Sequence, residues 1–151
     1  MWINESSYLD KGFEISTDKS LLDKDFIYDY LAHQSYWAKG IPRDKVETSI
    51  KESVCFGVYH HQTQIGFARV ISDKSTFAYL ADVFIIDTYR KQGLSKWLMQ
   101  TIMAYPDFQS LRRWSLATAD AHELYKKFGF ESLNAPDRWM QIFTPYQKTE
   151  P

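Results

Sequence analysis

The sequence has 151 residues, 44% hydrophobic and 25% charged, which predicts one domain spanning residues 1–151. Its formal net charge of −1 argues against a general affinity for nucleic acid or for anionic membranes. The single cysteine excludes an internal disulfide and a multi-cysteine metal site, and no signal pattern or long apolar run occurs, so we expect a cytoplasmic protein without a metal or a membrane span.

The first half of the chain predicts one strand, two helices and a three-stranded meander. Residues 13–17 alternate as a strand, and Asp18 or Ser20 can cap a helix that carries Leu22, Phe26 and Tyr30 on one face. A short helix follows within 40–53. Residues 54–72 read as two strands around a turn at 60–63, and 76–86 is apolar enough for a central strand buried on both faces.

The second half predicts alternating helices and strands. Apolar residues recur at helical spacing over 94–105, residues 112–118 read as a strand, and a helix over 119–128 ends at Gly129. Two short strands are expected at 130–133 and 139–143. This order of elements predicts an α+β fold with a mixed sheet.

The stretch YRKQGLSKW, residues 89–97, joins the central strand to a helix and has the chemistry of an anion site. The first turn of a helix presents unpaired N–H groups, Gly93 allows close approach of an anion, and Arg90, Lys91 and Lys96 add positive charge. A diphosphate would suit it. The phosphate-loop and dinucleotide-binding glycine patterns are both absent, which favours coenzyme A over a nucleoside triphosphate or NAD.

The wider string VFIIDTYRKQGLSKWLMQTI resembles motif A of the GNAT superfamily of acyl-CoA-dependent N-acyltransferases, through Arg90-Lys91-Gln92-Gly93-Leu94-Ser95 together with Tyr89 and Ile85. The string LATADAHELYKKFGFE resembles motif B of the same family, and the likeness covers residues 13–143. The family often has glycine at the positions of Lys91 and Ser95. Lys91 should help to bind a diphosphate provided that its backbone conformation is ordinary.

The resemblance implies a GNAT-type fold, whose mixed, mostly antiparallel sheet has about seven strands flanked by about four helices and splays at the fourth strand. It implies an N-acetyltransferase that uses acetyl-CoA as cosubstrate and lets a primary amine attack it directly in a ternary complex. The residues then expected to bind the cosubstrate are Val83, Phe84, Ile85, Arg90, Lys91, Gln92, Gly93, Leu94, Ser95, Lys96, Asp120 and Tyr125.

Two catalytic residues are expected, each with an alternative. Tyr125 matches the motif B tyrosine that is proposed as general acid in relatives, but its spacing also allows it to pack in the apolar stripe of its helix. Asp82, a carboxylate inside an apolar strand, is the candidate general base, and it could equally be a structural acid paired with an arginine. Asp120 could contact the pantetheine arm or serve as an ordinary acid at a helix start.

The acceptor side is expected to involve Tyr36, Trp37 and Phe56. The two neighbouring aromatics could close over a small amine or could form a hydrophobic flap on the sheet. A small-molecule amine is the default acceptor. The alternatives are a protein or peptide N-acetyltransferase and a non-catalytic acyl-CoA sensor or partner-binding module, and a homodimer stays open because dimers are common among relatives.

Overall fold

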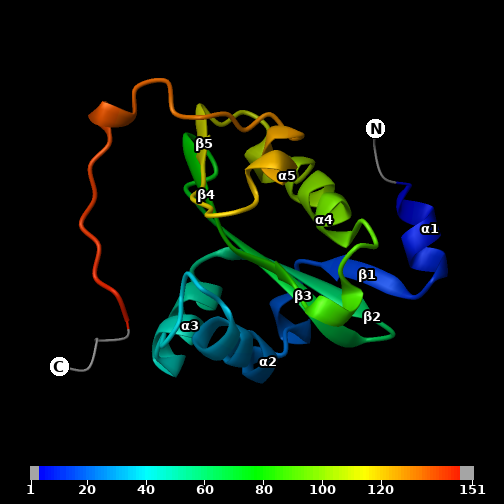
Figure 1. Ribbon diagram of the computed structural model, residues 1–151. Coiled ribbons are helices and arrows are strands. Elements are labelled where there is room, and N and C mark those ends of the chain that lie inside the picture. Colours follow the sequence, from blue (N-terminus) through cyan, green and yellow to red (C-terminus); the bar gives the residue numbers. More distant parts are fainter. Residues whose placement is uncertain (1–3, 147–151) are drawn as a thin grey trace.

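The computed structural model describes residues 4–146 and contains one five-stranded sheet in the order β1-β2-β3-β4-β5 (Figure 1). The strands are β1 (Phe13–Ser16), β2 (Val54–His60), β3 (Thr63–Ser72), β4 (Phe77–Ile85) and β5 (Arg113–Ser115). Strands β1 to β4 run antiparallel to one another in sequence, whereas β5 runs parallel to β4. The sheet and the helices beside it confirm the expected α+β, GNAT-type fold.

Helices cover both faces of the sheet. The α-helices are α1 (Glu5–Asp10), α2 (Lys24–Asp29), α3 (Arg43–Lys51), α4 (Leu94–Met103) and α5 (His122–Lys126). Shorter helical turns are η1 (Lys19–Leu21), η2 (Tyr30–Gln34), η3 (Asp87–Tyr89), η4 (Pro106–Phe108) and η5 (Pro136–Arg138). In Figure 1, α2 and α3 lie on one side of the sheet, and α4 and α5 lie on the other.

The start of the first predicted long helix differs from expectation. The side chain of Asp18 caps only the short turn η1, by accepting from the N–H of Ser20. The helix itself begins later, where the side chain of Asp23 accepts from the N–H of Phe26. Helix α1, which was not expected, is capped in the same way by Asn4 and precedes β1. Each start therefore depends on a local acidic or amide side chain that satisfies an unpaired N–H.

Strand β4 contributes to two hydrophobic cores, as its near-continuous apolar sequence predicts. On the α4 side, Leu80 and Ile85 pack in a cluster with Trp97 and Leu98. On the α2 and α3 side, Phe84 packs in a second cluster. The strand is therefore buried on both faces and holds the two helical layers in a fixed relation.

A bulge and a splay shape the end of β4. Phe67 pairs with Phe84 and Arg69 pairs with Ala81, so Asp82 and Val83 together face one residue of β3, and Asp82 has a φ of 55°. Strand β5 pairs with β4 only from Phe77 to Tyr79. In the part of the chain that the structure describes, β4 has no strand partner on this side beyond Tyr79, so the expected splay is confirmed.

The predicted strands at 130–133 and 139–143 do not form. The described residues after α5 contain only the turn η5, and the sheet has five strands instead of about seven. Figure 1 shows the chain after η5 running clear of the rest of the molecule. These segments pair with no strand among the residues that the structure describes, and an isolated strand leaves its backbone groups unpaired. Within residues 4–146, no helix has the length and apolarity needed to cross a membrane.

Candidate functional site

A cleft of about 590 Å³ lies where the end of β4 meets the turn that leads into α4. The η2 segment with the residues after it, and the start of α5, supply its other walls. Every residue that the sequence predicts for the cosubstrate lines this cleft, except Gln92. Those residues are Val83, Phe84, Ile85, Arg90, Lys91, Gly93, Leu94, Ser95, Lys96, Asp120 and Tyr125.

The turn before α4 depends on two left-handed residues. Gly93 has a φ of 79° and caps α4, so the unpaired N–H groups of the first helical turn open towards the cleft. Lys91 has a φ of 65°, a conformation that L-residues adopt at a cost. Lys91 was expected to help to bind a diphosphate provided that its backbone conformation is ordinary, and this condition is not met. The left-handed conformation explains why glycine suits this position. Lys91 still lines the cleft with its charge.

Gln92 does not line the cleft, and its carbonyl is bonded to another element. The phenol of Tyr8 in α1 donates a 2.6 Å hydrogen bond to the carbonyl oxygen of Gln92. The Tyr8 ring also stacks on Trp97 of α4, with 4.8 Å between ring centroids. Helix α1 thus contacts the turn before α4 and stabilises it, and the sequence did not indicate this contact.

Arg90 connects three elements around the cleft. Its Nε donates to the carbonyl oxygen of Ile85 at 3.1 Å, one terminal nitrogen donates to the phenol of Tyr30 at 3.2 Å, and the other lies 2.9 Å from a carboxylate oxygen of Asp87. Its charge is therefore partly neutralised by Asp87. Lys91 and Lys96 make no ion pair with any described residue, so they supply the available positive charge.

Tyr125 is buried and lies between two cavities. It lines the cleft, and it also lines a groove of about 690 Å³ between β5, α5 and residues 130–141. Burial raises the pKa of its phenol to about 12, with smaller contributions from Tyr36 and Asp120. The two alternatives for Tyr125 are compatible, because the side chain packs in the core and also reaches the cleft.

Asp82 is paired with an arginine, as expected if it is a structural acid. One carboxylate oxygen accepts from Nε of Arg69 at 2.9 Å, and the other accepts from Nε1 of Trp37 at 2.8 Å. Arg69 also donates to the hydroxyl of Ser53 at 3.2 Å. The carboxylate is 8% exposed and does not line the cleft. The carboxylate is held by two donors and lies outside the cleft, so the geometry favours the structural role.

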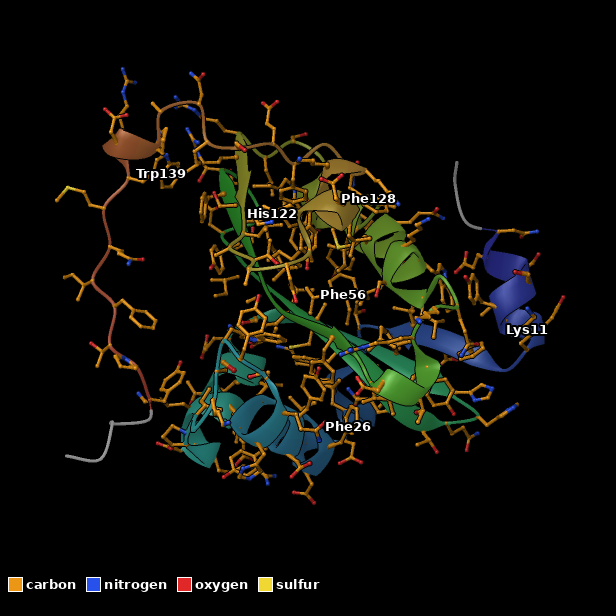
Figure 2. The ribbon with its side chains drawn as sticks, in the orientation of Figure 1. Lys11, Phe26, Phe56, His122, Phe128 and Trp139 are labelled. Atoms are coloured by element: carbon orange, nitrogen blue, oxygen red, sulfur yellow. The ribbon has the colours of Figure 1, made fainter. Side chains whose placement is uncertain are left out.

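The aromatic residues expected on the acceptor side separate into two groups. Tyr36 and Trp37 line the cleft in an edge-to-face pair with 5.1 Å between centroids, and the phenol of Tyr36 accepts from the N–H of Ala119 at 2.8 Å. Phe56, in contrast, is fully buried against Tyr105 on the α4 side of β2 (Figure 2). Its expected place beside the acceptor is wrong, because a central strand directs this side chain into the core.

Two parts of the cleft were not predicted. Tyr30 stacks on Phe84 with 3.8 Å between centroids, and Gln34 and Ser35 follow it. The four-residue spacing assigned Tyr30 to a helix stripe, but α2 continues into a wider π-type turn, in which the N–H of Ser35 bonds to the carbonyl of Tyr30. This turn carries the chain into the cleft wall. Leu124 lines the cleft together with Tyr125, and the helix predicted over 119–128 already included it.

Comparisons with known proteins agree on the family. Residues 51–132 match the model of an acetyltransferase (GNAT) domain. A Gibberella zeae protein assigned as an acetyltransferase is 31% identical over 133 residues, covering 75% of each chain. A solved structure from Xanthomonas campestris pv. campestris, assigned to acetyltransferases of the GNAT family, is 48% identical, with a TM-score of 0.87 over 89% of this chain and 94% of that one.

A second solved structure supports the fold alone. It is a Staphylococcus aureus protein described as a probable acetyltransferase, 24% identical, with a TM-score of 0.72 over 87% of this chain and 98% of that one. The family match covers the strand, turn and helix that build the cleft, and the Xanthomonas structure extends the likeness to nearly the whole chain. The chain therefore belongs to the GNAT family of acetyltransferases.

Proposed function

We propose that this acetyltransferase transfers the acetyl group of acetyl-CoA to a primary amine of a small molecule, by direct attack within a ternary complex. The observation that carries the proposal is the cleft itself, in which a helix start, two lysines that form no ion pair within residues 4–146 and the splayed side of β4 meet at Tyr125. Acetyl-CoA would supply a thioester whose carbonyl carbon is open to an amine.

The donors of the turn fit a diphosphate ester. The N–H groups at the start of α4 carry the positive end of the helix dipole, and Gly93 keeps this end free of side-chain bulk. Lys91 and Lys96 add charge from both sides of the glycine. These groups would hold the diphosphate, while Asp120 and Leu124 would line the path from there towards Tyr125.

The splayed side of β4 would stabilise the oxyanion. Beyond Tyr79, the backbone on this side has no strand partner among the described residues, and Val83, Phe84 and Ile85 line the cleft. A backbone N–H here would donate to the acyl carbonyl oxygen and more strongly to the oxyanion that develops from it. Loss of one such donor typically slows a reaction by about 10²–10³.

Tyr125 would stabilise the leaving thiolate by a hydrogen bond. Burial raises the pKa of its phenol to about 12, so the phenol keeps its proton at pH 7. An alkyl thiol has a pKa near 8.5, so complete transfer of the phenol proton would be uphill by roughly 5 kcal/mol. We therefore assign to Tyr125 the role of donor to the thiolate, and the final proton comes from solvent.

The acceptor amine would enter beside Tyr36 and Trp37. Trp37 is fixed by its bond to Asp82, which is in turn held by Arg69. Because both oxygens of Asp82 are engaged, its part in the proposed reaction is to position Trp37, and the amine would lose its proton to water. A wall of two half-exposed rings suits a small amine better than an extended peptide.

The test is thiol release from acetyl-CoA against amines, amino acids, polyamines and peptides. Tyr125→Phe should lower kcat by about 10²–10³, as for loss of one hydrogen-bond donor, and leave the affinity for coenzyme A within about twofold. Tyr59→Phe is the matched control, because Tyr59 is also buried with a pKa raised to about 12 but does not line the cleft. Gly93→Glu should abolish coenzyme A binding.

The outcomes separate the alternatives. Turnover restricted to peptides would replace the small-molecule acceptor with a protein. Tight acetyl-CoA binding without turnover on any amine would favour a sensor. Equal loss of rate in Tyr125→Phe and Tyr59→Phe would contradict a role for Tyr125 at the thiolate.

A further inference from the structure

The turn before α4 contains one peptide plane that is free to take two orientations. Lys91 and Gly93 both have a positive φ, of 65° and 79°, and Gln92 lies between them. Rotation of the Gln92–Gly93 peptide changes ψ of Gln92 and φ of Gly93, and glycine adopts either sign of φ about equally readily. The glycine that allows an anion to approach closely therefore also allows this peptide to flip.

The orientation of this peptide decides what the turn offers to an anion. The peptide is planar and trans, so the N–H of Gly93 points opposite to the carbonyl of Gln92. Among the described residues, the ladder of α4 begins with the bond from the N–H of Trp97 to the carbonyl of Gly93, so the N–H of Gly93 can join the unpaired groups of the first turn. In the flipped orientation, the carbonyl oxygen of Gln92 would face the anion and repel it.

Tyr8 holds one of these two orientations. Its phenol donates a 2.6 Å hydrogen bond to the carbonyl oxygen of Gln92. Gly93 lines the cleft, whereas Gln92 and Tyr8 do not. Figure 1 shows α1, which carries Tyr8, beside the start of α4 on the side away from α5, and the start of α5 is a wall of the cleft. Because the carbonyl is bound towards α1, the N–H of Gly93 is directed to the opposite side, where the cleft lies.

The phenol of Tyr8 is itself held in place by the core. Its ring stacks on Trp97 of α4, with 4.8 Å between centroids and 10° between planes, and meets the ring of Phe13 edge to face at 6.1 Å. Trp97 is 1% exposed, so the stack lies on a fixed surface. The donor is therefore ordered before any ligand arrives, and binding need not supply the free energy to order it.

The start of the turn is tied to the same helix through His60. Its Nε2 lies 3.1 Å from the carbonyl oxygen of Lys11, which caps the end of α1, and its Nδ1 lies 3.0 Å from the phenol oxygen of Tyr89. A carbonyl only accepts, so Nε2 carries the proton, and in the neutral ring Nδ1 accepts from Tyr89. Tyr89 is fixed in this way, and the freedom that remains in the turn lies in residues 91–93.

We propose that Tyr8 is a positioning residue for the cosubstrate, because it holds the Gln92–Gly93 peptide with the N–H of Gly93 directed at the diphosphate of coenzyme A. The inference rests on the proposed function, since it takes coenzyme A as the ligand of this turn. Tyr8 does not touch the ligand and acts through Gln92 and Gly93. Its hydroxyl should therefore matter for the diphosphate and for no other part of the ligand.

The first test is calorimetric titration of the full chain with coenzyme A. Tyr8→Phe keeps the stacked ring and removes the donor, so the affinity should fall about tenfold, as for one hydrogen bond to a charged group. Tyr28→Phe is the matched control and should bind as the wild type does, because Tyr28 is a partly buried tyrosine of α2 that does not line the cleft.

The two ways to fail are distinguishable. Equal affinity in Tyr8→Phe and the wild type would overturn the inference and leave the proposed function standing. A wild-type protein that does not bind coenzyme A would overturn both.

A second measurement observes the peptide itself. With ¹⁵N-labelled glycine, the Gly93 amide is one of six glycine signals, and it is identified as the one missing from Gly93→Ala. In the wild type, coenzyme A should move the Gly93 amide proton downfield, since the amide gains a charge-assisted hydrogen bond, whereas pantetheine, which lacks the diphosphate, should not. In Tyr8→Phe, saturating coenzyme A should produce a smaller shift.

This spectrum separates positioning from a merely structural role. If Tyr8 positions the peptide, the other glycine signals of the free protein should be the same in Tyr8→Phe and in the wild type. Displacement of all the glycine signals in free Tyr8→Phe would mean a general loss of packing and would contradict the proposal. A Gly93 shift as large in Tyr8→Phe as in the wild type would show that Tyr8 does not set the orientation of this peptide.

Discussion

Replacing Lys91 by glycine should make the protein more stable and its coenzyme A binding weaker. Lys91 has a φ of 65°, and a left-handed backbone costs an L-residue roughly 1–2 kcal/mol, whereas glycine adopts it freely. Glycine also lowers the free energy of unfolding by about 0.5–1 kcal/mol, because it gives the unfolded chain more conformational freedom. The net gain is about 0.5–1 kcal/mol, or about 1–4 °C in Tm for a chain of this size.

Loss of the Lys91 charge should weaken coenzyme A binding, although the same substitution stabilises the fold. A unit charge about 4 Å from a phosphate near water contributes on the order of 1 kcal/mol, so Lys91→Gly should weaken coenzyme A binding roughly fivefold at low salt and less at high salt. Lys91→Ala removes the same charge but keeps the left-handed cost. It should bind coenzyme A as weakly as Lys91→Gly without the gain in Tm.

Thermal unfolding by circular dichroism and coenzyme A titration by calorimetry measure the two effects. Lys74 provides the control, since its φ is 63° in an exposed turn that does not line the cleft. Lys74→Gly should raise Tm with coenzyme A affinity unchanged, because its long 3.7 Å ion pair with Asp107 is exposed and contributes little. If Lys91→Gly is no more stable than Lys91→Ala, the left-handed conformation of Lys91 carries no cost and the reasoning fails.

Two further predictions concern buried polar groups. Asp82→Ala should lower the free energy of unfolding by about 3 kcal/mol in urea titrations, because it leaves Arg69 buried without its carboxylate; a loss below 1 kcal/mol would show that the pair is solvated. Burial raises the pKa of Tyr59 and Tyr125 to about 12, so the folded state keeps protons that the unfolded state loses above pH 10. Stability should therefore fall as the pH rises from 10 to 12, and Tyr125→Phe should make that fall shallower; an equal slope in the variant would place its phenol in water.

The part of the cleft proposed for the cosubstrate was predictable because it is local. Strand, turn and helix form one continuous stretch, so the spacing of Arg90, Gly93 and the apolar residues of α4 fixes both the elements and the direction of the free N–H groups. The exceptions follow from distant contacts. Gln92 does not line the cleft, and its carbonyl accepts a hydrogen bond from Tyr8, 84 positions earlier, which no pattern around Gln92 indicates.

The two missing strands have a different cause. Their sequences have the composition of strands, and that part of the pattern was interpreted correctly, but a strand also needs an edge to pair with. Among the described residues, no strand pairs with the second edge of β5, so these two segments find no partner there.

Asp82 shows why an acid in an apolar strand is weak evidence for a general base. The sequence shows that Asp82 is an isolated charged residue in an apolar strand. It shows neither the bulge nor Arg69, the neighbour on β3 that neutralises the carboxylate. At the bulge, two residues of β4 face one of β3, and the carboxylate of Asp82 reaches Arg69 on β3 and Trp37 in the loop after η2. The same bulge sits where β4 separates from β5, so Asp82 and Arg69 fix the geometry of the opening. Substitutions at Asp82 should therefore change KM for the acceptor through Trp37, together with the stability of the fold.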